Sequence, residues 1–127
     1  MSTPYDTDDA MVADESVQIR ALNDAFRREL PSVVTALMHN RLVFTSGVAA
    51  HGDEFIDRAL KAVRECAAFN EDNDPYGEHD FGSFQLDGAK LYWKIEYYDR
   101  LFDGRSRNPA NAATTRRVLT ILLAEEY

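Results

Sequence analysis

The sequence predicts a small α+β domain in which an antiparallel sheet of three or four strands is packed by about three helices. Three observations support this fold class. Two segments carry apolar residues at helical spacing, one segment alternates apolar and polar residues as a strand does, and an Asp-Gly dipeptide marks a hairpin. The chain has 127 residues, which suits one domain, and its hydrophobic fraction of 45% is enough for a core.

The first helix is predicted from about residue 15 to residue 29. Asp14 is a good N-cap, and Pro31 ends the helix because the residue before a proline disfavours the α region. The residues expected to be buried follow helical spacing: Val17, Ala21, Leu22, Ala25, Phe26 and Leu30. The residues expected on the exposed face are Gln18, Arg20, Asn23, Asp24, Arg27 and Arg28. We expect 1–13 to be a disordered acidic arm and 14–127 to be a single α+β domain.

The middle of the chain predicts a strand and a second helix. Residues 41–45 fit a strand that Gly47 closes, while 33–38 fit either the first strand of a hairpin or a helical turn. A helix is predicted at about 53–67, because its apolar residues form one stripe: Phe55, Ile56, Ala59, Leu60, Val63 and Ala67.

The clearest strand signal is a hairpin at 83–99. Asp87-Gly88 favours a tight turn because glycine tolerates a positive φ. The chain then alternates, and the face expected in the core holds Leu91, Trp93, Ile95 and Tyr97. For the terminal segment, at about 112–126, a closing helix is favoured, with a short buried strand at 118–123 as the alternative.

The charge and composition of the chain argue against nucleic-acid-binding, membrane-spanning and secreted proteins. The chain has 14 Lys and Arg against 22 Asp and Glu, a net charge of −8. Direct nucleic-acid binding needs clustered cations, so we expect none, and an acidic surface suits a basic partner protein. Cys66 is the only cysteine, which fits a reducing cytoplasm. There is neither an apolar run of about 20 residues for a membrane span nor a signal-peptide pattern.

The connector at 69–84 is the most distinctive stretch of the chain. It holds turn-forming Asn, Pro and Gly residues, His79, and five acidic residues: Glu71, Asp72, Asp74, Glu78 and Asp80. Three interpretations are open. The acidic and Asn side chains can cap backbone amides in a structural turn, they can form a surface for a partner, or they can hold a cation.

An enzymatic role is the weaker interpretation. The connector does not follow the spacing of an EF-hand loop, and the chain has no phosphate-binding glycine loop and no nucleophile elbow. The alternative function is a small metal-dependent or carboxylate-using hydrolase, with its site at Asp72, Asp74, His79 and Asp80. The favoured interpretation needs no cofactor and no metal.

Five segments of the chain resemble a family of uncharacterised bacterial proteins: 19–27, 45–50, 71–84, 93–99 and 117–127. The run from Asp72 to Gly82 is the most specific of them. The resemblance implies no activity and no catalytic residue. It implies a gene carried on plasmids, integrative elements and phages, beside anti-restriction and other accessory genes.

We therefore expect a non-enzymatic interaction protein of a mobile element. It would bind and inhibit a basic host protein, such as a nucleic-acid-binding defence complex of the restriction or CRISPR type, by mimicking the charge of DNA. The expected partner-binding residues are Glu71, Asp72, Asp74, Glu78 and Asp80, with a second patch at Asp6, Asp8 and Asp9. A homodimer formed through the edge of the hairpin remains open.

Overall fold

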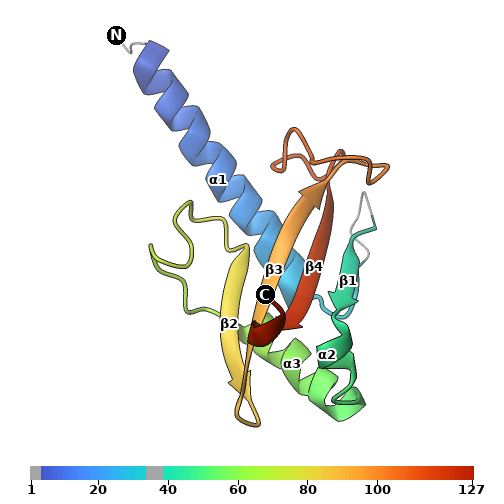
Figure 1. The fold of residues 1–127 in the computed structure, drawn as a ribbon. Helices are drawn as coiled ribbons and strands as arrows, with labels where there is room; N and C mark the ends of the chain where they lie inside the picture. Colours follow the sequence, from blue (N-terminus) through green and yellow to red (C-terminus); the bar gives the residue numbers. More distant parts are fainter. Residues whose placement is uncertain (1–3, 34–38) are drawn as a thin grey trace.

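A computed structural model describes residues 4–33 and 39–127, with side chains described for 15–33 and 39–127. The elements in chain order are α1 (Pro4–Arg28), β1 (Arg41–Phe44), α2 (Ser46–Ala49), α3 (Asp53–Glu65), β2 (Phe81–Leu86), β3 (Ala89–Tyr98), β4 (Arg116–Leu123) and the 3-10 helix η1 (Ala124–Glu126). Figure 1 shows one sheet, with α1 and α3 behind it. The predicted small α+β fold is confirmed, with three α-helices and four strands in the described residues.

The sheet is mixed rather than wholly antiparallel. Its strand order is β1-β4-β3-β2, and both the β2–β3 and β3–β4 pairs are antiparallel. β1 pairs with β4 in parallel, in the register Arg41↔Val118 to Phe44↔Ile121. Two helices and the hairpin separate these strands along the chain. Such a connection is long enough to return the chain in the same direction, as parallel pairing requires.

The hairpin forms at the predicted place. Leu86 pairs with Ala89 across Asp87 and Gly88, which have φ of 51° and 80°. Positive φ at both central residues is the geometry that matches the twist of the flanking strands.

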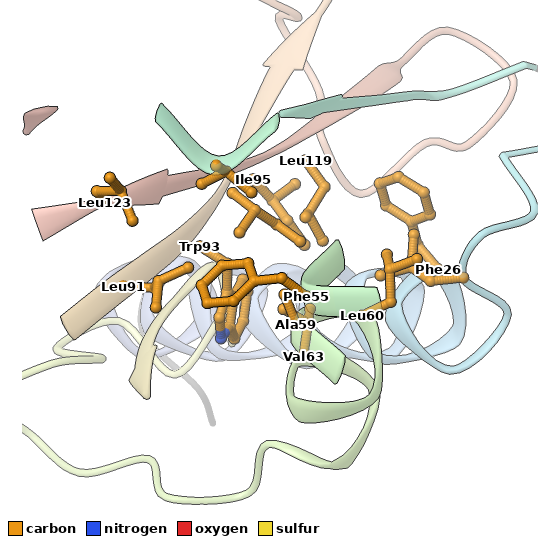
Figure 2. Packing of buried hydrophobic residues seen from close by; sticks show 13 residues of the cluster. Phe26, Phe55, Ala59, Leu60, Val63, Leu91, Trp93, Ile95, Leu119 and Leu123 are labelled. Carbon is orange, nitrogen blue, oxygen red and sulfur yellow. The ribbon is translucent and has the colours of Figure 1, made fainter. Parts of the chain in front are cut away.

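The core lies between the sheet and the helices. Leu91 and Trp93 of β3 and Leu119 and Ile121 of β4 are fully buried, which confirms the predicted core face of the hairpin. Figure 2 labels the core side chains that the helices contribute, Phe26, Phe55, Ala59, Leu60 and Val63, and two more from the strands, Ile95 and Leu123. The second helix is also confirmed, because α3 spans Asp53–Glu65 and buries Phe55, Ala59, Leu60 and Val63 of the predicted stripe. It ends two residues before the predicted end, so Ala67 lies outside the helix and is exposed.

The first helix differs from its prediction in two ways. It starts at Pro4, well before the predicted start near residue 15. A proline is tolerated in the first turn of a helix, and acidic residues nearby complement the helix dipole. In addition, Asn23 and Arg27 are buried, while Val17 is 50% exposed. The buried face is therefore rotated from the predicted one, because polar partners on other elements cover Asn23 and Arg27.

The predicted closing helix is wrong, and its alternative, a buried strand, is correct. Residues 116–123 form β4, the strand between β1 and β3. Arg117, Leu119, Ile121 and Leu123 are all buried. Alternate residues of a strand lie on the same face, so this period of two places all four against the helices. Two neighbouring strands supply the ladder that makes the strand more stable than a helix.

The remaining differences lie around the first strand. β1 ends at Phe44, and Thr45 caps α2, so Gly47 belongs to that helix and does not close the strand. The prediction for 33–38 falls largely outside the described residues. In the part of the chain that the structure describes, no helix is both long and apolar enough to cross a membrane.

Candidate functional site

The acidic connector between α3 and β2 is held together by its own side chains. Asn70 Oδ1 accepts hydrogen bonds from the backbone N–H groups of Asp72 and Asn73. In return, Asn73 Oδ1 accepts from Asn70 N–H, and the Asn73 amide donates to the carbonyl of Ala68. These reciprocal bonds form Asx-type turns, so residues 68–73 adopt a defined path without regular secondary structure.

Asp74 points inward and caps the second half of the connector. It is 8% exposed, and its Oδ1 accepts from the backbone N–H groups of Glu78, at 2.9 Å, and His79, at 3.1 Å. Gly77 and His79 both have positive φ, which lets the chain turn tightly around the carboxylate. The Asp74 carboxylate therefore caps two part-buried backbone amides of the connector.

Helix α1 fastens the connector to the body of the protein. Arg20 donates to the carbonyl of Gly77, and the fully buried amide of Asn23 donates to the carbonyl of Glu78 at 2.9 Å. Asn23 also donates to the Tyr97 hydroxyl, which in turn donates to the Glu78 carboxylate at 2.8 Å. Burial raises the pKa of Tyr97, so its hydroxyl keeps the proton that this bond needs.

A second group of contacts begins at Asp24, the next residue of α1. Asp24 accepts from Arg27 at 2.8 Å and lies 2.9 Å from Nδ1 of His79. Burial opposes the charge of Asp24, but the bonds from Arg27 and His79 outweigh it and hold its pKa below the usual value. The His79 ring stacks on Phe69 with centroids 3.8 Å apart, so both ends of the connector are packed together.

Arg117 of β4 completes a polar cluster that we define as Asn23, Glu78, Tyr97 and Arg117, in which Asn23 and Arg117 are buried and the other two are half-buried. Its Nε donates to Asn23 Oδ1 at 2.7 Å, and its guanidinium donates to the carbonyl of Pro109. Burial lowers the pKa of Arg117 to about 10. The cluster joins α1, the connector, β3, β4 and the loop before β4 through hydrogen bonds.

Asp80 lies apart from these bonds, at the end of the connector. Burial raises its pKa from 3.8 to about 6, and the negative charge of Glu78 acts in the same direction. Asp80 and Glu96 line a cavity of about 350 Å³ together with Tyr98 and Arg105. A carboxyl group with such a pKa exchanges its proton near neutral pH, as a general acid or base must.

The raised pKa of Asp80 predicts a pH-dependent stability. In the folded state the group binds its proton more tightly than in the unfolded chain. Its favourable contribution is therefore complete below pH 3.8 and is lost as the pH rises through about 6. We expect Asp80→Asn to be more stable than the parent above that range and equally stable below it. Urea unfolding across the range measures this, and a stability difference that does not change with pH contradicts it.

The structure separates the five predicted partner-binding residues into two groups. Glu71 and Asp72 are exposed, and Tyr76 between the two halves of the connector is 77% exposed. The other predicted residues turn toward the protein: Asp74 is buried, and Glu78 and Asp80 are half-buried. Asp6, Asp8 and Asp9 lie on α1, where the structure describes the backbone.

The hydrolase alternative named Asp72, Asp74, His79 and Asp80. The structure brings Asp74 Oδ2 to 3.7 Å from His79 Nε2, while Asp72 is exposed. Among the described side chains, no three from His, Cys, Asp and Glu are grouped so that they could hold a metal ion.

Sequence reasoning missed Asn23, Tyr97 and Arg117 as parts of the site. A signal existed for Arg117, because it shares the period of two with Leu119, Ile121 and Leu123. Asn23 has a weaker signal, its spacing of three and four residues from Phe26 and Arg27 on one helix face. Neither pattern names the partner that each polar group meets.

Comparison of the chain with known protein families gives a match that covers most of the residues of this site. Residues 44–126 match the model of a family described as protein of unknown function (DUF3768). The matched range includes the connector, the hairpin and β4, while α1 with Asn23 precedes it. No curated protein and no solved structure shows a significant match to the chain.

Proposed function

Because the chain belongs to the DUF3768 family of proteins of unknown function, we propose its function from the geometry of the connector: it is a non-enzymatic interaction protein that binds a basic partner protein. The contact residues are Glu71, Asp72 and Tyr76. Asp74 and Glu78 are assigned to holding and shaping the loop, because their side chains turn inward and accept hydrogen bonds. Asp80 also turns inward but lies apart from these bonds, so it is not assigned as a contact residue.

One observation carries the proposal: a loop held by hydrogen bonds exposes a large aromatic side chain and two carboxylates, those of Glu71 and Asp72. Tyr76 is 77% exposed, in a loop fixed by Asp74, Asn23 and Arg20. A loop that is ordered before binding loses less conformational entropy when it docks. Tyrosine is also enriched among the residues that dominate binding energy at protein interfaces.

The charge of the chain supports a basic partner. The net charge of −8 attracts a basic protein over a distance, and Glu71 and Asp72 add negative charge to the loop that carries Tyr76. Electrostatic attraction of this kind speeds association and weakens as salt screens the charges. A partner that normally binds nucleic acid carries the complementary surface.

The biological setting is part of the same proposal. We place the protein in the cytoplasm, encoded on a bacterial mobile element, where it occupies the phosphate-binding channel of a host defence complex and so blocks that complex. The resemblance of the connector to accessory proteins of such elements supports this setting, and the single cysteine suits a reducing compartment.

The test starts with a pull-down of the tagged protein from a bacterial lysate at low and moderate salt, with mass spectrometry of the bound proteins. We expect a stoichiometric basic partner that salt releases. In a direct binding assay, Glu71→Gln/Asp72→Asn/Tyr76→Ala should then weaken affinity at least about tenfold. The three side chains are exposed, so the melting temperature should stay unchanged.

A matched control variant distinguishes the contribution of the loop residues to affinity from that of the net charge of the chain. Glu15→Gln/Asp57→Asn/Tyr127→Ala removes the same chemical groups from exposed positions elsewhere. We expect it to bind the partner as the parent does. Equal affinity for both variants would show that the connector is not the contact surface, and a preparation that retains no protein at either salt concentration would contradict the function.

The second candidate function is a carboxylate-using hydrolase, and Asp80 is the observation that favours it. Its pKa of about 6 and its position in a cavity beside Glu96 suit proton transfer. The described residues show no nucleophile paired with a base in that cavity, so the interaction role is the better supported of the two.

A further inference from the structure

Arginine side chains gather at one end of this acidic protein. The loop between β3 and β4, drawn in orange in Figure 1, and the first residue of β4 surround a cavity of about 700 Å³. Four arginines line it, against one carboxylate, that of Asp99: Arg100, Arg105, Arg107 and Arg116. We call this the arginine cavity. Pockets of this volume are typical of small-molecule sites.

The arginines of the cavity lack carboxylate partners. Among the described side chains, the ion pairs of arginine involve Arg27 with Asp24 and Arg58 with Asp87, and none involves the cavity. Asp99 Oδ1 instead accepts from the backbone N–H groups of Leu101 and Asp103 and shapes the turn. The cavity therefore keeps a net positive charge in a chain whose total is −8.

The loop that carries the arginines is held in place. Ser106 N–H donates to the carbonyl of Tyr97, and Asp99 N–H donates to that of Gly104. The hydroxyls of Ser106 and Thr115 lie 2.6 Å apart, and Thr115 is buried. The backbone positions of Arg105 and Arg107 are fixed by these bonds, so the cavity exists before any ligand arrives.

Phe102, next to Leu101 of the cavity, has a strained backbone and packs its ring against two guanidinium groups. Its φ is 58°, a left-handed conformation that is costly for a bulky side chain and is concentrated at functional sites. The guanidinium groups of Arg41 and Arg116 lie 3.7 Å and 5.0 Å from the centroid of its ring. These contacts position Arg116, whose buried Nε has no hydrogen-bond partner among the described residues.

We propose that the arginine cavity binds a small phosphate-bearing molecule through at least two phosphate groups. A guanidinium donates two parallel hydrogen bonds to phosphate oxygens, and several arginines around one cavity fit more than one phosphate. A long nucleic acid would extend from the cavity over a surface with a net negative charge, which repels it. A compact diphosphate avoids that repulsion. The proposal does not depend on the protein partner inferred above.

Calorimetric titration of the full chain at low ionic strength tests the proposal, with inorganic phosphate, pyrophosphate and ADP as the probes. We expect pyrophosphate and ADP to bind more tightly than phosphate. Equal binding of pyrophosphate and ADP indicates that the phosphates alone are recognised, and tighter ADP binding indicates a nucleotide; both support the site. No heat from any probe up to about 10 mM overturns it.

Two variants assign the binding to the cavity. Arg100→Gln/Arg105→Gln/Arg107→Gln should weaken pyrophosphate binding about 30-fold, because charge-assisted hydrogen bonds are lost. The control Arg28→Gln/Lys61→Gln/Lys90→Gln removes the same charge from exposed positions and should change affinity less than about threefold. Equal losses in both variants overturn the proposal.

Two further measurements test whether the loss of pyrophosphate binding reflects misfolding and whether the cavity prefers DNA. If the Gln variant has a lowered melting temperature, the same three positions are changed to Lys. Lysine keeps the positive charge but lacks the planar guanidinium group that donates two parallel hydrogen bonds. That variant should bind with intermediate affinity. A short DNA duplex is titrated in parallel, and tighter binding of DNA than of pyrophosphate overturns the small-molecule assignment.

Discussion

Asn23→Ala is expected to lower the free energy of unfolding by about 3 kcal/mol. Asn23 is fully buried and hydrogen-bonds Arg117, Tyr97 and the carbonyl of Glu78. Alanine removes all three bonds at once. It leaves the Nε of Arg117 as a buried charged donor without its acceptor, and such groups are costly.

Urea unfolding measures the change, and hydrogen exchange locates it. We expect the amides of 69–80 to exchange faster in the variant, because Asn23 ties the connector to α1. Gln18→Ala, an exposed change on the same helix, serves as the control and should leave both measurements near those of the parent. An Asn23→Ala variant as stable as this control would show that the polar cluster adds nothing to stability.

Asp74→Ala is expected to destabilise the protein by about 2 kcal/mol, through loss of the cap inside the connector. The carboxylate accepts from the N–H groups of Glu78 and His79, and both lose their acceptor in the variant. Thermal and urea unfolding provide the measurement. The connector should also become sensitive to proteolysis near Tyr76, since the turn that supports this residue is no longer held.

Asp72→Ala is the matched control two residues earlier. Asp72 is exposed, and its backbone N–H, rather than its side chain, makes the bond to Asn70. We expect its stability to equal that of the parent and its partner affinity to fall. If Asp72→Ala destabilises as much as Asp74→Ala does, the division between holding residues and contact residues is wrong.

The elements predicted correctly are those whose signal is local. The apolar stripe of α3 and the Asp87-Gly88 turn each depend on residues within a few positions of one another. The same holds for the alternation that buries Leu91 and Trp93. Local backbone preference and side-chain period agree in these segments, so a single sequence is enough to recognise them.

The terminal segment shows where local signals conflict. Its apolar residues fit a buried helix as well as a buried strand, and short apolar runs do not distinguish the two by period. The strand forms because β1 and β3 offer hydrogen bonds on both sides of β4. The strands of that ladder are distant in sequence. The residues near Val118 therefore do not determine by themselves whether the segment forms a helix or a strand.

By itself, the sequence determined the α+β class, the second helix, the hairpin and the position of an acidic, turn-rich connector before β2. Only the tertiary structure decided which carboxylates of that connector turn inward and which are exposed. Asn23 meets Glu78 across 55 residues of chain and Arg117 across 94. A buried polar side chain must find a partner wherever the fold provides one, and such distant pairing leaves no periodic pattern in the sequence.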